Sequence, residues 1–271
     1  MCIKSQSAAS LFHSELRTAL LARSAITDPE ELDRTGRVFY QHKARPVLKQ
    51  GKAVQSYHVL AHSLVHHLRN VSDGTWLEFG VAAGFSTNAT CKAIRQRGLR
   101  GQWHVHGFDT FSGLPEAWRT SSGVVMDAGH FSQGGRLPQV EKPCGILHKG
   151  LLNTTLPAVV ESLQRSGSNV AGLSIDVDLY AGSRQGLDLT FPLLKEGALL
   201  HFHELGRGRC CANKCGASEC WPRSAVQDEA RALHDFLRTK RPQALLALLP
   251  ITGPPGQPEQ AAAFKLVRTG T

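Results

Sequence analysis

The chain has 271 residues, which is long enough to bury a substantial core without disulfides or metal ions. Hydrophobic residues make up 41% of it and charged residues 20%, a composition that is typical of a globular protein and excludes a disordered or fibrous one. No stretch approaches the ~20 consecutive apolar residues of a membrane-spanning helix, so we expect no membrane partner.

The chain is basic, with 31 Lys and Arg residues against 22 Asp and Glu residues and a formal net charge of +9. Such a surplus attracts phosphates and keeps nucleic acid among the candidate partners. The positive residues are spread along the chain, however, with no run of five or more. This distribution favours a well-solvated basic surface and disfavours a nucleic-acid partner.

The N-terminus lacks the continuous apolar segment of a secretory signal, which predicts a cytoplasmic protein. Residues 1–25 are rich in Ser and contain a single acid, Glu15, so an organellar transit peptide is an alternative. Leu11, Leu16 and Leu20 instead suit the apolar side of a first helix.

Strand-like and helix-like segments alternate along most of the chain. The predicted helices are 10–23, 52–69, 86–94, 153–167, 183–195 and 224–240, and the predicted strands are 75–80, 103–109, 145–148, 170–178 and 197–205. Thr155 is the expected N-cap of the helix in the segment 153–167. This order favours a Rossmann-like, doubly wound α/β fold with a mostly parallel sheet of about seven strands, preceded by N-terminal helices. No helix separates the last two apolar runs, 244–251 and 262–267, which predicts an antiparallel hairpin at one edge.

We expect an N-terminal helical extension over 1–70, serving as a cap or for homo-oligomerisation, and one α/β domain over 71–271. The Gly-, Ser- and Pro-rich segment 110–143 is too long for an ordinary connection, so we expect it to be functional. A Cys-rich insertion at 206–222 interrupts the domain. Zinc, disulfides and free thiols are the alternatives for its cysteines, and free thiols are favoured because the spacing is not two C-x-x-C pairs: Cys210, Cys211, Cys215 and Cys220.

A glycine-containing turn follows the first strand of this domain in the segment LEFGVAAGFST. Gly80 and Gly84 let the backbone turn sharply and approach a ligand closely. Ser86 opens a helix whose N–H groups and dipole favour an anion. The turn lacks the second glycine of the dinucleotide fingerprint. Glu78 instead precedes it, which suits a cationic ligand that carries a carboxylate, such as S-adenosylmethionine.

Acidic residues end three further strands. Asp109 ends the second strand, where an acid can accept both hydroxyls of a ribose; a plain turn role is the alternative. Asp176 and Asp178 point the same way in a strand, and two such carboxylates repel each other unless a cation or a proton lies between them. His203 and Glu204 follow the next strand and are potential ligands. Because open α/β sheets bind ligands at the carboxyl ends of their strands, we expect these groups to share one cleft.

Several segments resemble the macrocin O-methyltransferase family, from about residue 75 to residue 240. They are LEFGVAAGFST, GFDTFSGLPEAW, GLLNTTLP, IDVDLYAGSRQGLDLTFPLLKEGALL, and the pair HE followed by SAVQDEARALHDFL. The family consists of class I, S-adenosylmethionine-dependent, metal-assisted enzymes. The resemblance implies that Asp176, His203 and Glu204 bind a divalent ion and that Asp178 is the general base. The GVAAGFS loop is also similar to the caffeoyl-CoA O-methyltransferase pattern.

One departure concerns the metal. The family usually has two adjacent acids where this chain has His203 and Glu204. Magnesium prefers oxygen ligands, whereas imidazole suits Mn, Fe, Co or Zn. The ion is therefore predicted to be Mg or, given His203, Mn, Fe or Zn, and an empty site is the alternative.

Together these features predict an S-adenosylmethionine-dependent O-methyltransferase. Its substrate is predicted to be a small polyhydroxylated molecule, sugar- or catechol-like, covered by Phe111 and Trp118 of the long segment. A bound ion would lower the pKa of two vicinal hydroxyls, as it does for water. An RNA-modifying methyltransferase, motivated by the charge, and a cofactor-binding protein without turnover, motivated by the altered ligand pair, are the alternatives.

Overall fold

The computed structural model describes residues 61–62, 64–66, 68, 74–99, 103–119, 124–203, 228–240, 245–249 and 262–267. The predicted helix 10–23, the boundary at residue 70, Glu204 and the Cys-rich insertion lie outside these residues, so what we predicted of them stays a prediction. No helix in the described part of the chain is both long enough and apolar enough to span a membrane.

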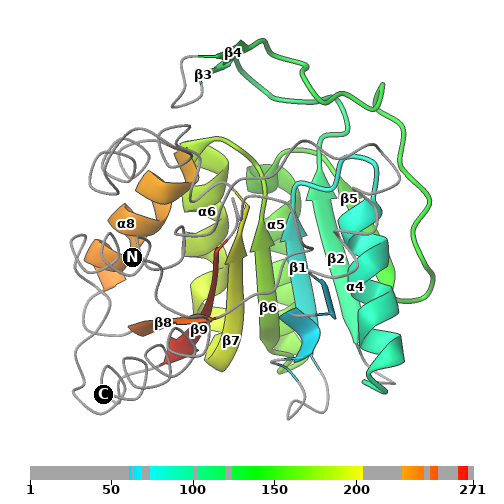
Figure 1. Ribbon diagram of the computed structural model, residues 1–271, viewed down its shortest axis with the longest axis vertical. Helices are drawn as coiled ribbons and strands as arrows, with labels where there is room; N and C mark the ends of the chain where they lie inside the picture. The colour runs from blue at the N-terminus through cyan, green and yellow to red at the C-terminus, as the bar shows by residue number, and fades with distance from the viewer. Residues whose placement is uncertain are drawn as a thin grey trace, which may run out of the picture.

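Seven strands form the main sheet in the order β5-β2-β1-β6-β7-β9-β8. Their bounds are β1 Thr75–Phe79, β2 His104–Asp109, β5 Gly145–Lys149, β6 Val170–Ile175, β7 Leu194–Phe202, β8 Leu245–Leu249 and β9 Ala262–Val267. The first five strands in sheet order run parallel, and β9 is antiparallel to both of its neighbours. The predicted α/β sheet with an antiparallel edge hairpin is therefore confirmed (Figure 1).

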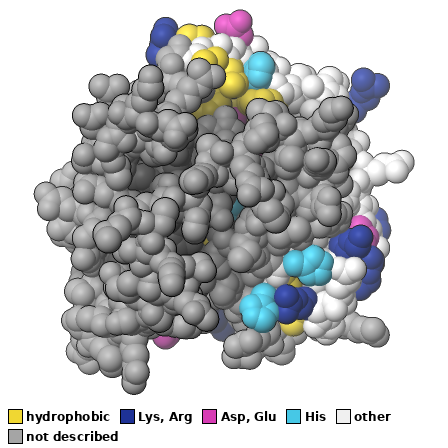
Figure 2. Space-filling view, viewed as in Figure 1, with side chains coloured by type: hydrophobic (Ala, Val, Ile, Leu, Met, Phe, Trp, Pro, Cys, Tyr) yellow, Lys and Arg dark blue, Asp and Glu magenta, His cyan; other side chains and the backbone are white. Residues whose placement is uncertain are grey.

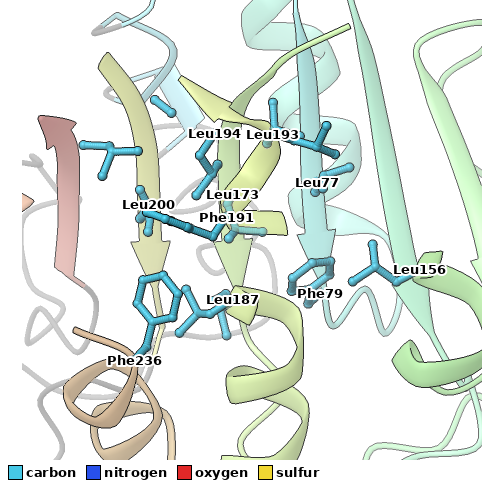
Figure 3. Close-up of a cluster of buried hydrophobic side chains, with 14 of the residues drawn as sticks. Leu77, Phe79, Leu156, Leu173, Leu187, Phe191, Leu193, Leu194, Leu200 and Phe236 are labelled. Carbon is cyan, nitrogen blue, oxygen red and sulfur yellow. The ribbon is translucent and has the colours of Figure 1, made fainter. Parts of the chain in front are cut away.

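Helices cover both faces of the sheet. The helices α5 (Leu152–Arg165), α6 (Tyr180–Thr190) and α8 (Asp228–Lys240) contribute to one core cluster, which includes Leu187, Phe236 and Phe79 of β1 (Figure 3). The helix α4 (Phe85–Gln96) and the helical residues near 64 contribute to the other, which includes Trp76. Each fully buried Leu or Phe side chain contributes about 1.5–3 kcal/mol, so these two clusters dominate the stability.

Two helices begin earlier than the sequence predicts. We expected Thr155 to cap the helix that starts near residue 153, but α5 begins at Leu152 and Leu151 is its N-cap. The Thr155 hydroxyl donates to the Leu151 carbonyl at 2.9 Å, so it lies inside the first turn and does not cap it. The helix α6 begins at Tyr180, two residues after Asp178. Its start therefore lies next to the predicted site.

The long connection between β2 and β5 is not wholly irregular. It contains a short antiparallel pair, β3 (Trp118–Arg119) and β4 (Val125–Met126). In Figure 1 this pair lies at the top of the view, beyond the ends of β1 and β2. Strands of two residues are too short to give an alternating pattern, which is why the sequence did not predict them.

The end of this connection is fixed onto α4. A disulfide joins Cys91 of α4 to Cys144, the residue before β5. Three residues earlier on the helix, the Asn88 amide donates to the Gln139 carbonyl at 3.0 Å and accepts from the Glu141 N–H at 2.8 Å. The helix α4, which follows the glycine turn, and the residues just before β5 are thus held together covalently and by hydrogen bonds.

Candidate active site

A cavity of about 730 Å³ opens at the carboxyl ends of β1, β2, β6 and β7, within the usual size range of small-molecule sites. Six of the predicted site residues line it: Gly80, Ser86, Asp109, Asp176, Asp178 and His203. Glu78 and Gly84 are not among the described lining residues, and Glu204 lies outside the residues that the structure describes. The predicted convergence on one end of the sheet is therefore present for most of the set.

Glu78 lies behind the glycine turn. It is 2% exposed and accepts hydrogen bonds from the Ser86 hydroxyl and, at 2.6 Å, from the Thr87 hydroxyl. Burial raises the pKa of its carboxyl group to about 7; the two hydroxyl donors oppose this rise, and the nearby Asp176 and Asp109 carboxylates add to it. Glu78 thus fixes the start of α4, and its predicted contact with a cationic ligand stays a prediction.

Gly80 is needed where the turn crosses the end of β6. Its φ is +88°, a conformation that side chains disfavour, and a Cβ atom there would lie 1.8 Å from the Asp176 carbonyl oxygen. The Gly80 N–H donates to the Phe108 carbonyl of β2 at 2.9 Å. Gly84, with φ +77°, is the N-cap of α4. The spacing of the two glycines therefore reflects one close backbone approach and one helix start.

Asp109 binds the chain's own backbone. One carboxylate oxygen accepts from the N–H groups of Val81 at 2.9 Å and Ala82 at 2.8 Å, and the other accepts from Phe111 at 2.6 Å. A carboxylate offers about four acceptor positions, so about one is left for a ligand. Asp109 can accept one ribose hydroxyl without disturbing the turn, which is less than the two-hydroxyl contact expected from the sequence.

Asp176 and His203 are brought together at the ends of the paired strands β6 and β7, with His203 Nδ1 3.1 Å from Asp176 Oδ1. At this distance the two side chains contact each other directly, as an ion pair when His203 is protonated. As a donor set, a carboxylate and an imidazole suit Mn, Fe or Zn better than Mg. Among the described residues, no group of three or more His, Cys, Asp or Glu is arranged to hold a metal. The third predicted ligand, Glu204, lies outside those residues.

Backbone strain gathers around the cavity. In the described part of the chain, five residues other than glycine have positive φ: Ala82, Phe111, Phe131, Asp178 and Asp228. Three of them line the cavity. Each such residue costs about 1–2 kcal/mol, and strain of this kind concentrates at functional sites. The strain supports this cavity as the functional one.

The outer wall of the cavity is largely apolar. Leu114, Trp118 and Leu179 form a small buried cluster, and half-exposed Phe131 lies at the rim. Hydrophobic side chains gather at the top of the molecule in Figure 2, where β3 and β4 lie in Figure 1. Trp118 thus lines the cavity as expected. Phe111, which we also expected over the substrate, is 1% exposed and is not among the described lining residues.

Sequence reasoning missed two residues beside this site. Glu229 of α8 accepts hydrogen bonds from the backbone N–H groups of Val177 and Asp178, and Asp228 accepts one from the Trp118 indole. The available signal was a pair of acids in the first turn of a helix, which is common because acids favour helix N-termini. That signal does not reveal which loops the helix faces.

Comparisons with known proteins agree with this geometry. Residues 77–205 match the family described as a methyltransferase domain. Over this segment the chain is similar to methyltransferases. The predicted enzyme class is thereby confirmed, while the narrower likeness to the macrocin family stays a prediction. No curated protein matches the chain.

Solved structures share the fold at low sequence identity. The calicheamicin methyltransferase CalS11 has a TM-score of 0.56 and 19% identity, over 98% of this chain and 94% of that one. An apo structure of CalS11, described as a TDP-rhamnose 3'-O-methyltransferase, has a TM-score of 0.50 and 20% identity, over 98% of this chain and 96% of that one. The O-methyltransferase NovP has a TM-score of 0.50 and 13% identity, over 89% of this chain and 100% of that one. At these identities the likeness concerns the fold and not the substrate.

Proposed function

We propose that this methyltransferase domain transfers the methyl group of S-adenosylmethionine to a hydroxyl of a small polyhydroxylated molecule, sugar- or catechol-like, with the help of a divalent ion. The observation that carries the proposal is the shared cavity. The glycine turn, Asp109, Asp176 and Asp178 come from three different strand ends and line one space. The names of CalS11 and NovP as O-methyltransferases support the same chemistry.

The glycine turn and Asp109 form the cofactor side of the proposed site. Gly80 allows the backbone to approach the ligand, and Ser86 at the start of α4 presents a helix N-terminus to its carboxylate. Asp109 accepts a ribose hydroxyl at its remaining acceptor position. S-adenosylmethionine, when bound, supplies an electrophilic methyl group.

The ends of β6 and β7 form the acceptor side. Asp176, His203 and Glu204 would hold a divalent ion, which when bound lowers the pKa of a hydroxyl that it contacts. Asp178 lines the cavity and is 9% exposed, so its carboxylate is placed to accept the proton of the acceptor hydroxyl with little competition from water. The apolar wall at Leu114 and Trp118 holds the acceptor against these groups. Such positioning is worth up to about 7–11 kcal/mol in well-oriented cases.

Calorimetry with S-adenosylmethionine and spin-resonance titration with Mn²⁺ test this proposal on the full chain. We expect binding of the methyl donor, and binding of Mn²⁺ that weakens about 10-fold or more in Asp176→Asn. Asp188→Asn is the matched control, since Asp188 lies on the surface of α6 in a pair with Arg184. Absence of donor binding, or unchanged Mn²⁺ affinity in Asp176→Asn, would contradict the proposal.

Labelled methyl transfer to aryl diols, free sugars and RNA then identifies the acceptor class. We expect transfer to a diol or a sugar and a strong loss of transfer in Asp178→Asn. Transfer to RNA alone would support the RNA-modifying alternative, and donor binding without transfer to any acceptor would support the cofactor-binding alternative.

A further inference from the structure

The first turn of α8 contacts the candidate site at two places. The Glu229 side chain is fully buried, and its Oε1 accepts from the Val177 N–H at 3.1 Å and from the Asp178 N–H at 3.3 Å. The neighbouring Asp228 accepts from the Trp118 indole N–H at 2.9 Å. Two consecutive residues thus contact the β6–α6 connection and the long β2–β5 connection.

The position of α8 is fixed by its packing on α6. The Tyr180 hydroxyl of α6 donates to Asp235 of α8 at 3.1 Å, and the ring of Phe191, the residue after α6, meets that of Phe236 edge to face at 5.3 Å. Because α6 begins two residues after Asp178, the same packing places Glu229 next to the connection that it binds. The packing of α8 therefore fixes the position of Glu229 relative to the β6–α6 connection.

The β6–α6 connection needs such support. Asp178 has a φ of +60°, which is unfavourable for a residue with a side chain. Glu229 accepts hydrogen bonds from the N–H groups of Asp178 and of Val177, which is the residue between Asp176 and Asp178. A buried N–H without an acceptor costs about 1–3 kcal/mol, so loss of Glu229 favours a rearranged connection.

We propose that Glu229 is a positioning residue, which holds the β6–α6 connection so that the Asp176 and Asp178 carboxylates face the cavity. Through Asp228, the same turn of α8 also holds Trp118 in the apolar wall of the cavity. The consequence for catalysis rests on the function proposed above for Asp178, whereas the effect on the backbone does not.

Hydrogen exchange of the Val177 and Asp178 amides tests the backbone effect without any methyl transfer. In Glu229→Leu, which removes the acceptor at similar volume, we expect exchange to be about 10-fold faster or more. Glu229→Gln keeps a carbonyl oxygen and is expected to exchange at the wild-type rate. Asp235→Ala is the control, because it removes a contact between α8 and α6 without removing the acceptor of the connection. Equal protection in Glu229→Leu and wild type would overturn the proposal.

Kinetics test the catalytic consequence. We expect Glu229→Leu to lower kcat about 10- to 100-fold, because small misplacements of reacting groups have effects of this size, with an unchanged KM for S-adenosylmethionine. Glu229→Gln should restore kcat. An equal loss of kcat in Asp235→Ala would mean that only general stability is involved, and would overturn the proposal. If the wild type transfers no methyl group, the proposed function fails while the exchange result stands.

Glu229→Asp covers the case in which Glu229→Leu does not fold. It keeps the charge and withdraws the acceptor by about 1.5 Å, one carbon–carbon bond. We expect faster exchange at Val177 and Asp178 and a reduced kcat. Wild-type behaviour in both measurements would overturn the proposal.

Discussion

The two halves of the cavity are held in different ways. On the β1–β2 side, the donors to Glu78 are hydroxyl groups only eight and nine residues further along the chain. On the β6–β7 side, the acceptor for the Asp178 N–H is Glu229, 51 residues away. In the first half, Glu78 is bound within one strand–turn–helix unit and Asp109 of the adjacent strand β2 closes the turn. The second half depends on a helix that docks from a distant part of the chain.

This difference has a consequence for mutations. Changes on the β1–β2 side should act on the glycine turn itself and on the binding of S-adenosylmethionine. Changes on the β6–β7 side can act at a distance, through α8, while the binding of S-adenosylmethionine, the methyl donor, stays unchanged. The following predictions probe where this division holds and where it breaks, from the largest expected effect to the smallest.

Gly80→Ala should have the largest effect, because Gly80 is where the two halves touch. The added Cβ would meet the Asp176 carbonyl oxygen at 1.8 Å in a backbone with φ +88°. Overpacking and an unfavourable φ together predict a loss of about 3–5 kcal/mol in unfolding free energy, and loss of donor binding. Denaturant titration and calorimetry measure both quantities.

Gly98→Ala is the matched control. Its φ is +69°, but no atom lies within 4 Å of the added Cβ. Only the backbone term remains, about 1–2 kcal/mol, and donor binding should be unchanged. Equal losses in the two variants would show that the approach of Gly80 to Asp176 is not important.

The disulfide braces the β1–β2 half from outside the cavity. It closes a segment with a sequence separation of 53 residues between Cys91 and Cys144, for which the chain-entropy account predicts up to about 4 kcal/mol. Reduction should lower the denaturation midpoint of the wild type and leave that of Cys91→Ser/Cys144→Ser unchanged. Because disulfides are typical of oxidising compartments, a bond that forms and stabilises would weigh against the predicted cytoplasmic location.

Glu78 predicts a pH dependence of stability. Its pKa in the folded protein is about 7, above the ordinary value of 4.5, so the fold favours the protonated form. The resulting stabilisation is complete below about pH 4.5 and is lost as the pH rises through about 7, at most about 3 kcal/mol. The unfolding free energy of the wild type should therefore fall relative to that of Glu78→Gln between about pH 4.5 and about pH 7, the window set by those two pKa values.

Glu161→Gln provides the comparison for this experiment, since it removes a carboxylate from the exposed face of α5. Its unfolding free energy should follow that of the wild type across the same pH range. A parallel course for Glu78→Gln and the wild type would mean that Glu78 is ionised throughout.

The same division explains what the sequence could predict. The alternation of strands and helices, the glycine turn and the strand-end acids follow from periodicity and from short motifs, and the structure brings most of the predicted site residues together. The start of α5 was wrong because Thr155 donates backward to a carbonyl within the first turn. Glu229 and the Cys91–Cys144 pair were missed because each depends on a partner about 50 residues away, which no local pattern encodes.

Asn88→Ala should have the smallest effect and separates the two braces of α4. It removes two hydrogen bonds to the end of the long connection, to Gln139 and Glu141, while the disulfide three residues further on stays in place. We expect a loss of about 1–2 kcal/mol in unfolding free energy, because a typical hydrogen bond contributes about 0.5–1.5 kcal/mol. After reduction the loss should grow, since Asn88 then carries the contact without the covalent bond. An equal loss in oxidised and reduced protein would show that the two braces act independently, and that the β1–β2 half is less unified than its short-range hydrogen bonds suggest.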